Sequence, residues 1–208
     1  MREVPLKIYR PAIILFLIVM VFSAMLDWTY NPNPIILMVI GNVIFLCSLS
    51  LYITNQYYKL QHNFLSMATN KGCWLSFIAF QIVLYSFYTW TPLLDSSADN
   101  TKNIIDNIGW LGVALIVVLI VPITEEIIFR LGVFDSVKVY GVAFQILFSS
   151  ALFTTLHYPE QLSQIVFIFA LGLILGISRF KSNGVVIPVF MHCIHNSTFL
   201  LYLWLFYD

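Results

Sequence analysis

Two neighbouring glutamates and an arginine stand inside a long, mostly apolar segment of the sequence. Glu125, Glu126 and Arg130 lie within the run 111–133. A charged side chain at the centre of a bilayer costs about 2.5–3.5 kcal/mol, so each charge must be paired or face a polar cavity. Glu126 and Arg130 have the i, i+4 spacing and the order that favour a helical ion pair. Glu125 points about 100° away around the helix and needs partners on another element.

Histidine and asparagine side chains near the ends of two later apolar segments are the partners we expect for Glu125. His157 follows Phe153 by four residues, and Asn196 follows His192 by four, so each pair shares one helical face. A single histidine is more often a packing residue, but two such faces beside an unpaired glutamate indicate a site. The alternative interpretation is a buried charge network that only fixes helix packing.

A carboxylate, two histidines and an amide in a membrane cavity suit the hydrolysis of a peptide bond by water. The carboxylate would remove a proton from water, and one histidine would hold that water. The remaining histidine and the amide would donate hydrogen bonds to the oxyanion. A serine nucleophile is not indicated, because GxSxG is absent and Ser149–Ser150 has no glycine elbow. The zinc motif HExxH is absent as well.

Membrane-spanning helices are the elements that must position these residues. Of the 208 residues, 60% are hydrophobic and 10% are charged, whereas soluble domains have about 25% charged residues. Ten basic and ten acidic residues cancel, so no nucleic-acid partner is expected. We therefore predict an all-α, polytopic membrane bundle with an intramembrane polar cavity, formed by residues 1–208 as a single domain. Seven runs approach the length of about 20 residues that a span needs: 11–27, 35–54, 74–93, 110–134, 141–157, 162–178 and 185–206.

Polar or turn-rich breaks separate the runs, among them 95–106, 135–141 and 179–184. Basic residues stand before the first run and after the second, fourth and sixth, which places the N-terminus in the cytoplasm and the C-terminus outside a cell membrane. A cleaved signal peptide is the alternative interpretation of the first run. The GxxxG spacing of Gly172 and Gly176 predicts close helix packing. The basic residues on the side predicted to be cytoplasmic are Arg2, Lys7, Arg10, Lys59, Lys71, Lys138, Arg179 and Lys181, and the opposite side has only Lys102.

The depths of the candidate groups agree with one another. If the hairpin after the fourth run turns at Gly141, Glu125 and His157 are each sixteen residues from the turn. At 1.5 Å per residue, both then lie about 24 Å from it. His192 lies about 12 Å deep if the last helix begins at Gly184. The three groups are therefore predicted to converge near the middle of the bilayer.

Three motifs, in this order, resemble those of the CAAX protease and bacteriocin-processing (CPBP, or Abi) family of intramembrane peptidases, which includes the type II CAAX prenyl endopeptidases. They are EExxxR at Glu125–Arg130, FxxxH at Phe153–His157 and HxxxN at His192–Asn196. The resemblance covers about residues 115–200, the expected catalytic core. It implies Glu125 as the base, His157 positioning the water, His192 and Asn196 stabilising the oxyanion, and Glu126, Arg130 and Phe153 in support.

The resemblance leaves the metal question with two answers, because the family has been described both as zinc peptidases and as metal-independent glutamate peptidases. Zinc held by Glu125, His157 and His192 is chemically reasonable. Glu126 would then have to leave Arg130 to act as the base. We therefore expect no metal cofactor, with zinc as the alternative.

The expected partners are membrane lipids and a peptide or small membrane-protein substrate. One version of the activity is C-terminal processing of a lipid-modified CAAX-type peptide. The other is cleavage of a bacteriocin, pheromone or small membrane protein, including self-immunity. A non-catalytic scaffold or immunity protein that retains the motifs is the alternative function. A transporter is disfavoured, because its polar residues would follow a path rather than gather at one depth.

Overall fold

The computed structural model describes residue 50 and residues 53–55, 65–88 and 95–206 of the chain. All regular structure in these ranges is helical, which confirms the predicted all-α class for this part of the protein. The predicted runs 11–27 and 35–54 lie outside the described residues, except for residues 50 and 53–54. The total of about seven spans therefore stays a prediction.

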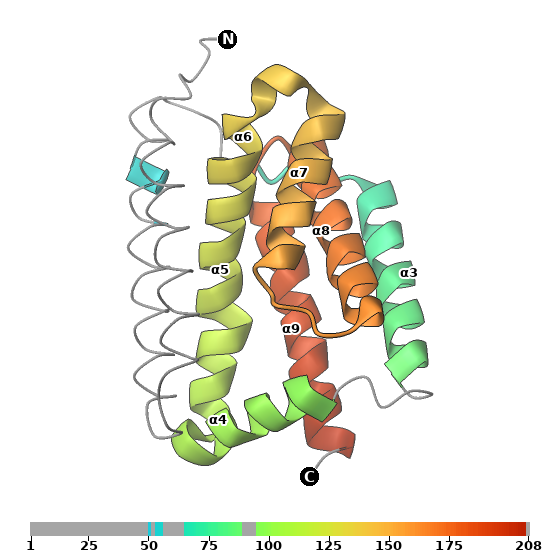
Figure 1. Cartoon of the computed structure of the whole chain (residues 1–208). Helices are drawn as coiled ribbons and strands as arrows, with labels where there is room; N and C mark the ends of the chain where they lie inside the picture. Colours follow the sequence, from blue (N-terminus) through green and yellow to red (C-terminus); the bar gives the residue numbers. More distant parts are fainter. Residues whose placement is uncertain (1–49, 51–52, 56–64, 89–94, 207–208) are drawn as a thin grey trace.

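Within the described residues, five helical segments run lengthwise through the bundle in alternating directions (Figure 1). Three of them are long and apolar enough to cross a membrane, namely Ile108–Ser136, Leu162–Ser182 and Val186–Phe206. Two shorter apolar helices accompany them. The five segments are α3 (Lys71–Tyr88), the composite Ile108–Ser136, α7 (Val142–Thr155), α8 (Leu162–Ser182) and α9 (Val186–Phe206).

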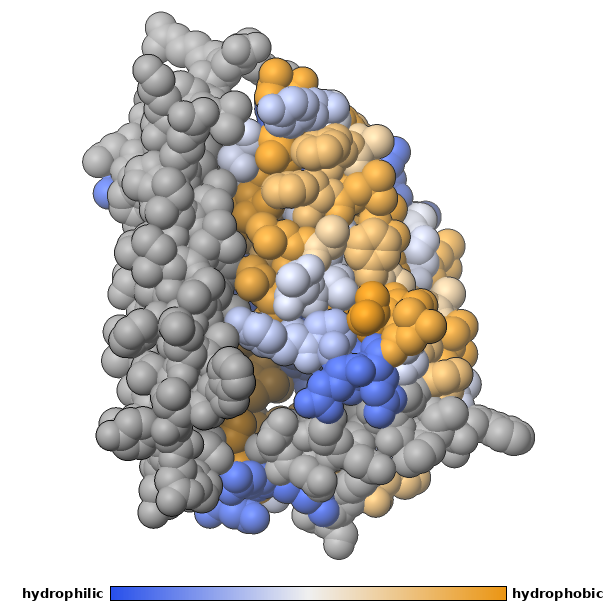
Figure 2. Space-filling model, in the orientation of Figure 1, coloured by the Kyte–Doolittle hydropathy of each residue, from blue (hydrophilic) through white to orange (hydrophobic). Residues whose placement is uncertain are grey.

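The outer surface of these helices is apolar, as a lipid-facing surface must be. Large exposed hydrophobic side chains occur on every lengthwise segment, and orange residues gather in the upper and right-hand part of the described face in Figure 2, above a region of blue residues. Apolar helices of this length and surface indicate a membrane protein. Examples are Leu75, Leu115, Phe148, Val166 and Trp204.

The predicted break 95–106 lies outside the candidate span Ile108–Ser136, and the predicted break 179–184 begins later than expected. The segment 95–106 is helical, within α4 (Asp95–Val113), which lies across the lower end of the bundle in Figure 1. Its polar composition suits a helix outside the apolar layer, and Gly109, with φ of 74°, then turns the chain into the long helix. The break predicted to begin at Arg179 begins later, because α8 continues to Ser182.

The predicted close packing at the GxxxG spacing is confirmed between α7 and α8. A Cβ atom on Gly172 would lie 3.1 Å from the Cα and Cβ atoms of Ser150. A Cβ atom on Gly176 would lie 3.4 Å from a methyl carbon of Ile146. Gly172 therefore lets the backbones of α7 and α8 approach closely, while Gly176 faces α7 at an ordinary packing distance.

Three of the connections predicted to be on the same side of the membrane do lie at one end of the bundle. A Cβ atom on Gly184 would lie 2.5 Å from the backbone oxygen of Ser66, so the segment that precedes α9 touches the segment that precedes α3. The turn after α6 (Phe134–Ser136) lies at the same end in Figure 1. This agrees with the alternation of the basic loops, while the orientation in a membrane stays a prediction.

Candidate active site

The segment that carries the two glutamates departs from regular α-helix on both sides of them. A short α-helix, α5 (Val121–Glu126), is flanked by two π-helical segments, η2 (Ala114–Ile120) and η3 (Ile127–Val133). π-Helical turns are rare and frequently occur at functional sites. Each π-helical turn rotates the residues that follow it around the helix axis. The directions in which Glu125 and Glu126 point relative to the rest of the long helix therefore depend on these turns as well as on regular helical spacing.

Glu125 lies between two histidines from different elements. Its Oε2 atom is 3.8 Å from Nε2 of His157 and 3.8 Å from Nε2 of His192. The same oxygen is buried and has no hydrogen-bond partner among the described residues. The three groups predicted to meet at one depth are therefore brought together by the long helix, the end of α7 and α9.

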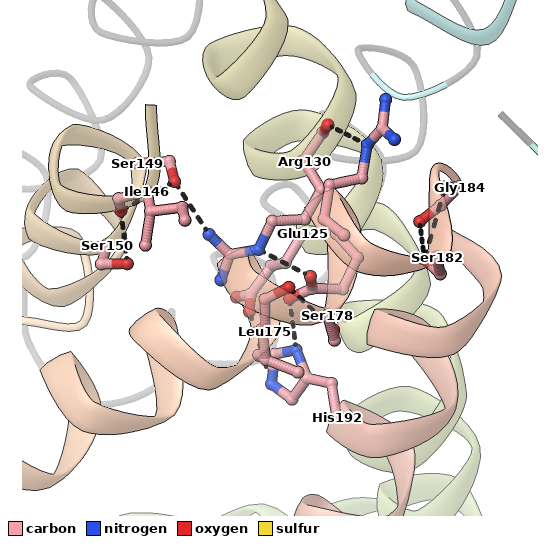
Figure 3. A network of polar contacts seen from close by, with 12 residues as sticks. Glu125, Arg130, Ile146, Ser149, Ser150, Leu175, Ser178, Ser182, Gly184 and His192 are labelled. Carbon is pink, nitrogen blue, oxygen red and sulfur yellow. Dashed lines mark hydrogen bonds and ion pairs between the residues drawn. The ribbon is translucent and has the colours of Figure 1, made fainter. Parts of the chain in front are cut away.

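Glu126 forms the predicted ion pair with Arg130, and its second oxygen has a further partner. Arg130 donates from Nε to Glu126 Oε2 at 2.9 Å, and both side chains are fully buried. His192 donates from Nδ1 to Glu126 Oε1 at 3.0 Å. Arg130 also donates from a terminal nitrogen to the hydroxyl of Ser149, 3.3 Å away (Figure 3). Sequence reasoning missed the contacts of His192 with Glu126 and of Ser149 with Arg130.

Hydrogen bonds fix which nitrogen of each histidine faces Glu125. Nδ1 of His157 is 2.7 Å from the backbone oxygen of Phe153, and this oxygen can only accept. Nδ1 of His192 likewise faces the carboxylate of Glu126. Each Nδ1 therefore carries a hydrogen, and in the neutral rings both Nε2 atoms present lone pairs towards Glu125 Oε2.

This arrangement matches the needs of one water molecule. Atoms separated by 3.8 Å, as Glu125 Oε2 is from each Nε2, can share a water about 2.8 Å from both. A water between these acceptors would donate one hydrogen to the carboxylate and one to a histidine. His157 is the more open of the two histidines, with 31% of its side chain exposed against 3% for His192.

Phe153 packs within the site rather than beside it. Its fully buried ring lies 4.3 Å from the ring of His157 and 5.7 Å from that of His192, measured between centroids. The guanidinium carbon of Arg130 is 5.3 Å from the same centroid. The aromatic residue of the FxxxH motif thus contacts both histidines and the arginine, which explains its place in the supporting group.

Asn196 contacts the backbone of the long helix. Its Nδ2 atom donates to the carbonyl oxygen of Val117 at 2.7 Å. At the end of η2, Val121 donates to the oxygen of Ile116, five residues back, instead of to Val117. The next residue, Pro122, has no N–H to offer. Asn196 therefore satisfies a carbonyl left open by the π-helical turn, and one of its two N–H groups remains for other partners.

His195 lies on another face of α9, away from Glu125. Its Nδ1 atom is 3.0 Å from Nε2 of Gln81 on α3, and its ring packs 6.1 Å from that of Phe80. This histidine therefore ties α9 to α3.

The set of Glu125, His157 and His192 has the donor types of a zinc site. Their 3.8 Å separations are wider than the roughly 3.4 Å that tetrahedral zinc imposes on neighbouring ligand atoms. Among the described residues, no group of three or more histidine, cysteine, aspartate or glutamate side chains has an arrangement that could hold a metal ion.

Residues 107–198 match the family model described as type II CAAX prenyl endopeptidase Rce1-like. This range begins just before the long helix and includes all three motifs, with Glu125, His157 and His192 inside it. No curated protein and no solved structure matches the chain.

Proposed function

Since residues 107–198 match the Rce1-like model of type II CAAX prenyl endopeptidases, in agreement with the resemblance of the three motifs, we propose that the protein is an intramembrane endopeptidase in which Glu125 activates water. The convergence of Glu125 Oε2 with Nε2 of His157 and His192 supports this proposal most directly. Glu125 has a buried oxygen that no described residue bonds, whereas Glu126 is held on both oxygens.

The proposed reaction begins with water held between His157 and Glu125. Glu125 Oε2 takes one proton from the water while its oxygen forms a bond to the carbonyl carbon of the peptide. The tetrahedral intermediate carries the negative charge on the former carbonyl oxygen. Its C–N bond then breaks, the proton on Glu125 passes to the leaving amine, and the carboxylate is regenerated.

His192 and Asn196 are proposed to stabilise the oxyanion. Because Glu126 binds Nδ1 of His192, only Nε2 faces the reaction, and it donates when the ring is doubly protonated. The bond to Val117 fixes the orientation of the Asn196 amide, and its second N–H is the proposed donor. Removing one oxyanion donor typically slows such reactions by about 10²–10³-fold.

We propose a membrane-associated or lipid-modified peptide as the substrate, of the CAAX type or a bacteriocin or pheromone precursor. The lipids around the apolar helices would present such a peptide at the depth of Glu125. The proposed topology is multi-pass, with the N-terminus in the cytoplasm and the C-terminus outside. The proposed chemistry uses no metal, because Glu125 acts as base and Glu126 is bound by Arg130.

The test compares purified wild-type protein with Glu125→Gln on a prenylated CAAX-type peptide and on the same peptide without its lipid. Glu125→Gln keeps the size of the side chain and removes its basicity, so turnover should stop while the protein still accumulates. Glu160→Gln is the matched control, because Glu160 is exposed and lies outside the site. Turnover by Glu125→Gln would refute the base assignment.

Comparative proteomics of small membrane peptides, with wild type against Glu125→Gln in cells, would identify the substrate. Peptides that accumulate uncleaved only in the variant are the expected result. If wild-type protein cleaves neither test peptide and the two cell lines have the same peptides, the protein is a scaffold or immunity protein that retains the motifs.

A further inference from the structure

Arg179 is a buried arginine that none of the three motifs contains. The basic-loop pattern placed it in a loop, but it lies in the last turns of α8 with 8% of its surface exposed. Its Nε atom donates to the backbone oxygen of Arg130 at 2.9 Å. A terminal nitrogen donates to the carboxylate of Asp135 at 3.1 and 3.4 Å. The guanidinium therefore joins α8 to the helix of the two glutamates.

The carbonyl group that Arg179 binds is one that the helix itself leaves open. In an α-helix, the N–H of Phe134 would donate to the oxygen of Arg130, four residues back. At the end of η3, it donates to Phe129 instead, five residues back. A return from π-helix to α-helix skips one carbonyl in this way, and a buried carbonyl without a partner is unfavourable. Arg179 supplies the missing donor.

The same arrangement occurs on the other side of the glutamates. At the end of η2 the skipped carbonyl belongs to Val117, and Asn196 of α9 supplies its donor. Side chains from the last two helices thus satisfy both skipped carbonyls that flank α5. If the N–H of Phe134 donated to Arg130 as in an α-helix, the π-helical turn would be lost. The helical segment before the turn would then rotate by about 100° and shift by about 1.5 Å relative to the segment after it.

We propose that Arg179 is a positioning residue for the peptidase, an inference that rests on the proposed function. By holding the backbone carbonyl of Arg130, it fixes the helical turn from which the Arg130 side chain reaches Glu126. Glu126 in turn orients His192, whose Nε2 faces Glu125. Arg179 touches neither the substrate nor the reacting atoms, and acts only through this chain of four contacts.

Two substitutions separate this role from general stabilisation. In Arg179→Gln, the side-chain nitrogen stands at the same number of bonds from Cα as Nε of arginine, so a donor to Arg130 remains. In Arg179→Met, the side chain has nearly the same length and shape as glutamine but no hydrogen-bond donor for the Arg130 carbonyl. Both variants lose the ion pair with Asp135, so their melting temperatures should fall together.

The expected result is a difference in kcat between the two variants. Arg179→Met should lower kcat per folded molecule by about tenfold, which corresponds to one lost hydrogen bond, with KM unchanged. Arg179→Gln should recover most of this loss. Equal kcat values in the two variants would overturn the proposal, even if both proteins melt earlier. Activity of Glu125→Gln, tested in parallel, would instead overturn the proposed function.

A second readout does not depend on activity. Arg130–Leu131 is the only Arg-Leu pair in the sequence, so ¹³C-carbonyl arginine with ¹⁵N-leucine gives a single carbonyl–amide resonance in NMR spectra. The carbonyl shift of Arg130 reports its hydrogen bond. It should move in Arg179→Met and stay near the wild-type position in Arg179→Gln. A carbonyl shift that is the same in all three proteins would overturn the proposal whatever the peptide assay shows.

Discussion

His192 donates its Nδ1–H to Glu126 Oε1 across 3.0 Å, and this contact joins α9 to the helix of the two glutamates. It gives the neighbouring carboxylates different environments. Glu126 is bound on both oxygens and fully buried, whereas Glu125 has one buried oxygen directed at two histidine nitrogens. Glu125 can therefore act on a bound water, while Glu126 holds the His192 ring that faces Glu125.

Arg130→Ala should destabilise the protein more than Glu125→Ala. Arg130 binds Glu126 and Ser149 and is fully buried, so its removal leaves a buried carboxylate without its cation. Breaking a buried pair in this way costs about 3–5 kcal/mol. Glu125 makes no comparable pair, and its loss should cost less. Thermal melts in detergent measure the difference, and equal melting temperatures for the two variants would contradict the role of the ion pair.

Gly184→Ala should also destabilise the protein, by about 1–3 kcal/mol. The added Cβ would lie 2.5 Å from the oxygen and 2.7 Å from the nitrogen of Ser66, and these backbone atoms cannot swing away as a side chain can. Gly176→Ala is the control, since its Cβ would make an ordinary 3.4 Å contact with Ile146. The melting temperature of Gly184→Ala should be the lower one, and the reverse order would show that the two segments separate easily.

Cysteines introduced at Thr69 and Lys181 should be labelled from the same side of the membrane, and one at Ser97 from the opposite side. Thr69 and Lys181 are exposed near the end where Gly184 meets Ser66, while α4 lies at the other end. The positive-inside rule makes the first side cytoplasmic. Labelling with a membrane-impermeant maleimide, applied to intact cells and to inverted vesicles, shows from which side each introduced cysteine is accessible. Labelling of Thr69 and Lys181 from opposite sides would require different helix positions in the membrane.

Activity of the purified protein should survive a chelator that removes zinc. A single carboxylate cannot comfortably be both a zinc ligand and the base, and Arg130 holds the other carboxylate. In the same experiment, His157→Ala should lose rate without a change in metal content. If the active enzyme carries about one zinc per chain, and activity is lost on chelation and regained with zinc, Glu125 is a ligand. Glu126 is then the first candidate for the base.

The amino-acid sequence was sufficient for the parts of the site that depend on local spacing. The i, i+4 spacing of Glu126 and Arg130 predicted their ion pair, because residues four apart on a helix are neighbours whatever surrounds them. Counting residues from the turn at Gly141 predicted that Glu125 and His157 lie level, because helical rise is nearly constant. Hydropathy likewise located the long apolar helices, and the motifs pointed to the peptidases whose family model matches residues 107–198.

Tertiary structure alone decided the contacts that depend on the π-helical turns. Nothing in regular helical periodicity shows that the carbonyls of Val117 and Arg130 are open, because a π-helical turn is selected by what packs against it. Asn196 and Arg179 come from helices far along the chain, and their donors meet these carbonyls only after α8 and α9 have packed. For the same reason, hydropathy placed Arg179 in a loop, since a buried arginine is identified by partners that the sequence does not place beside it.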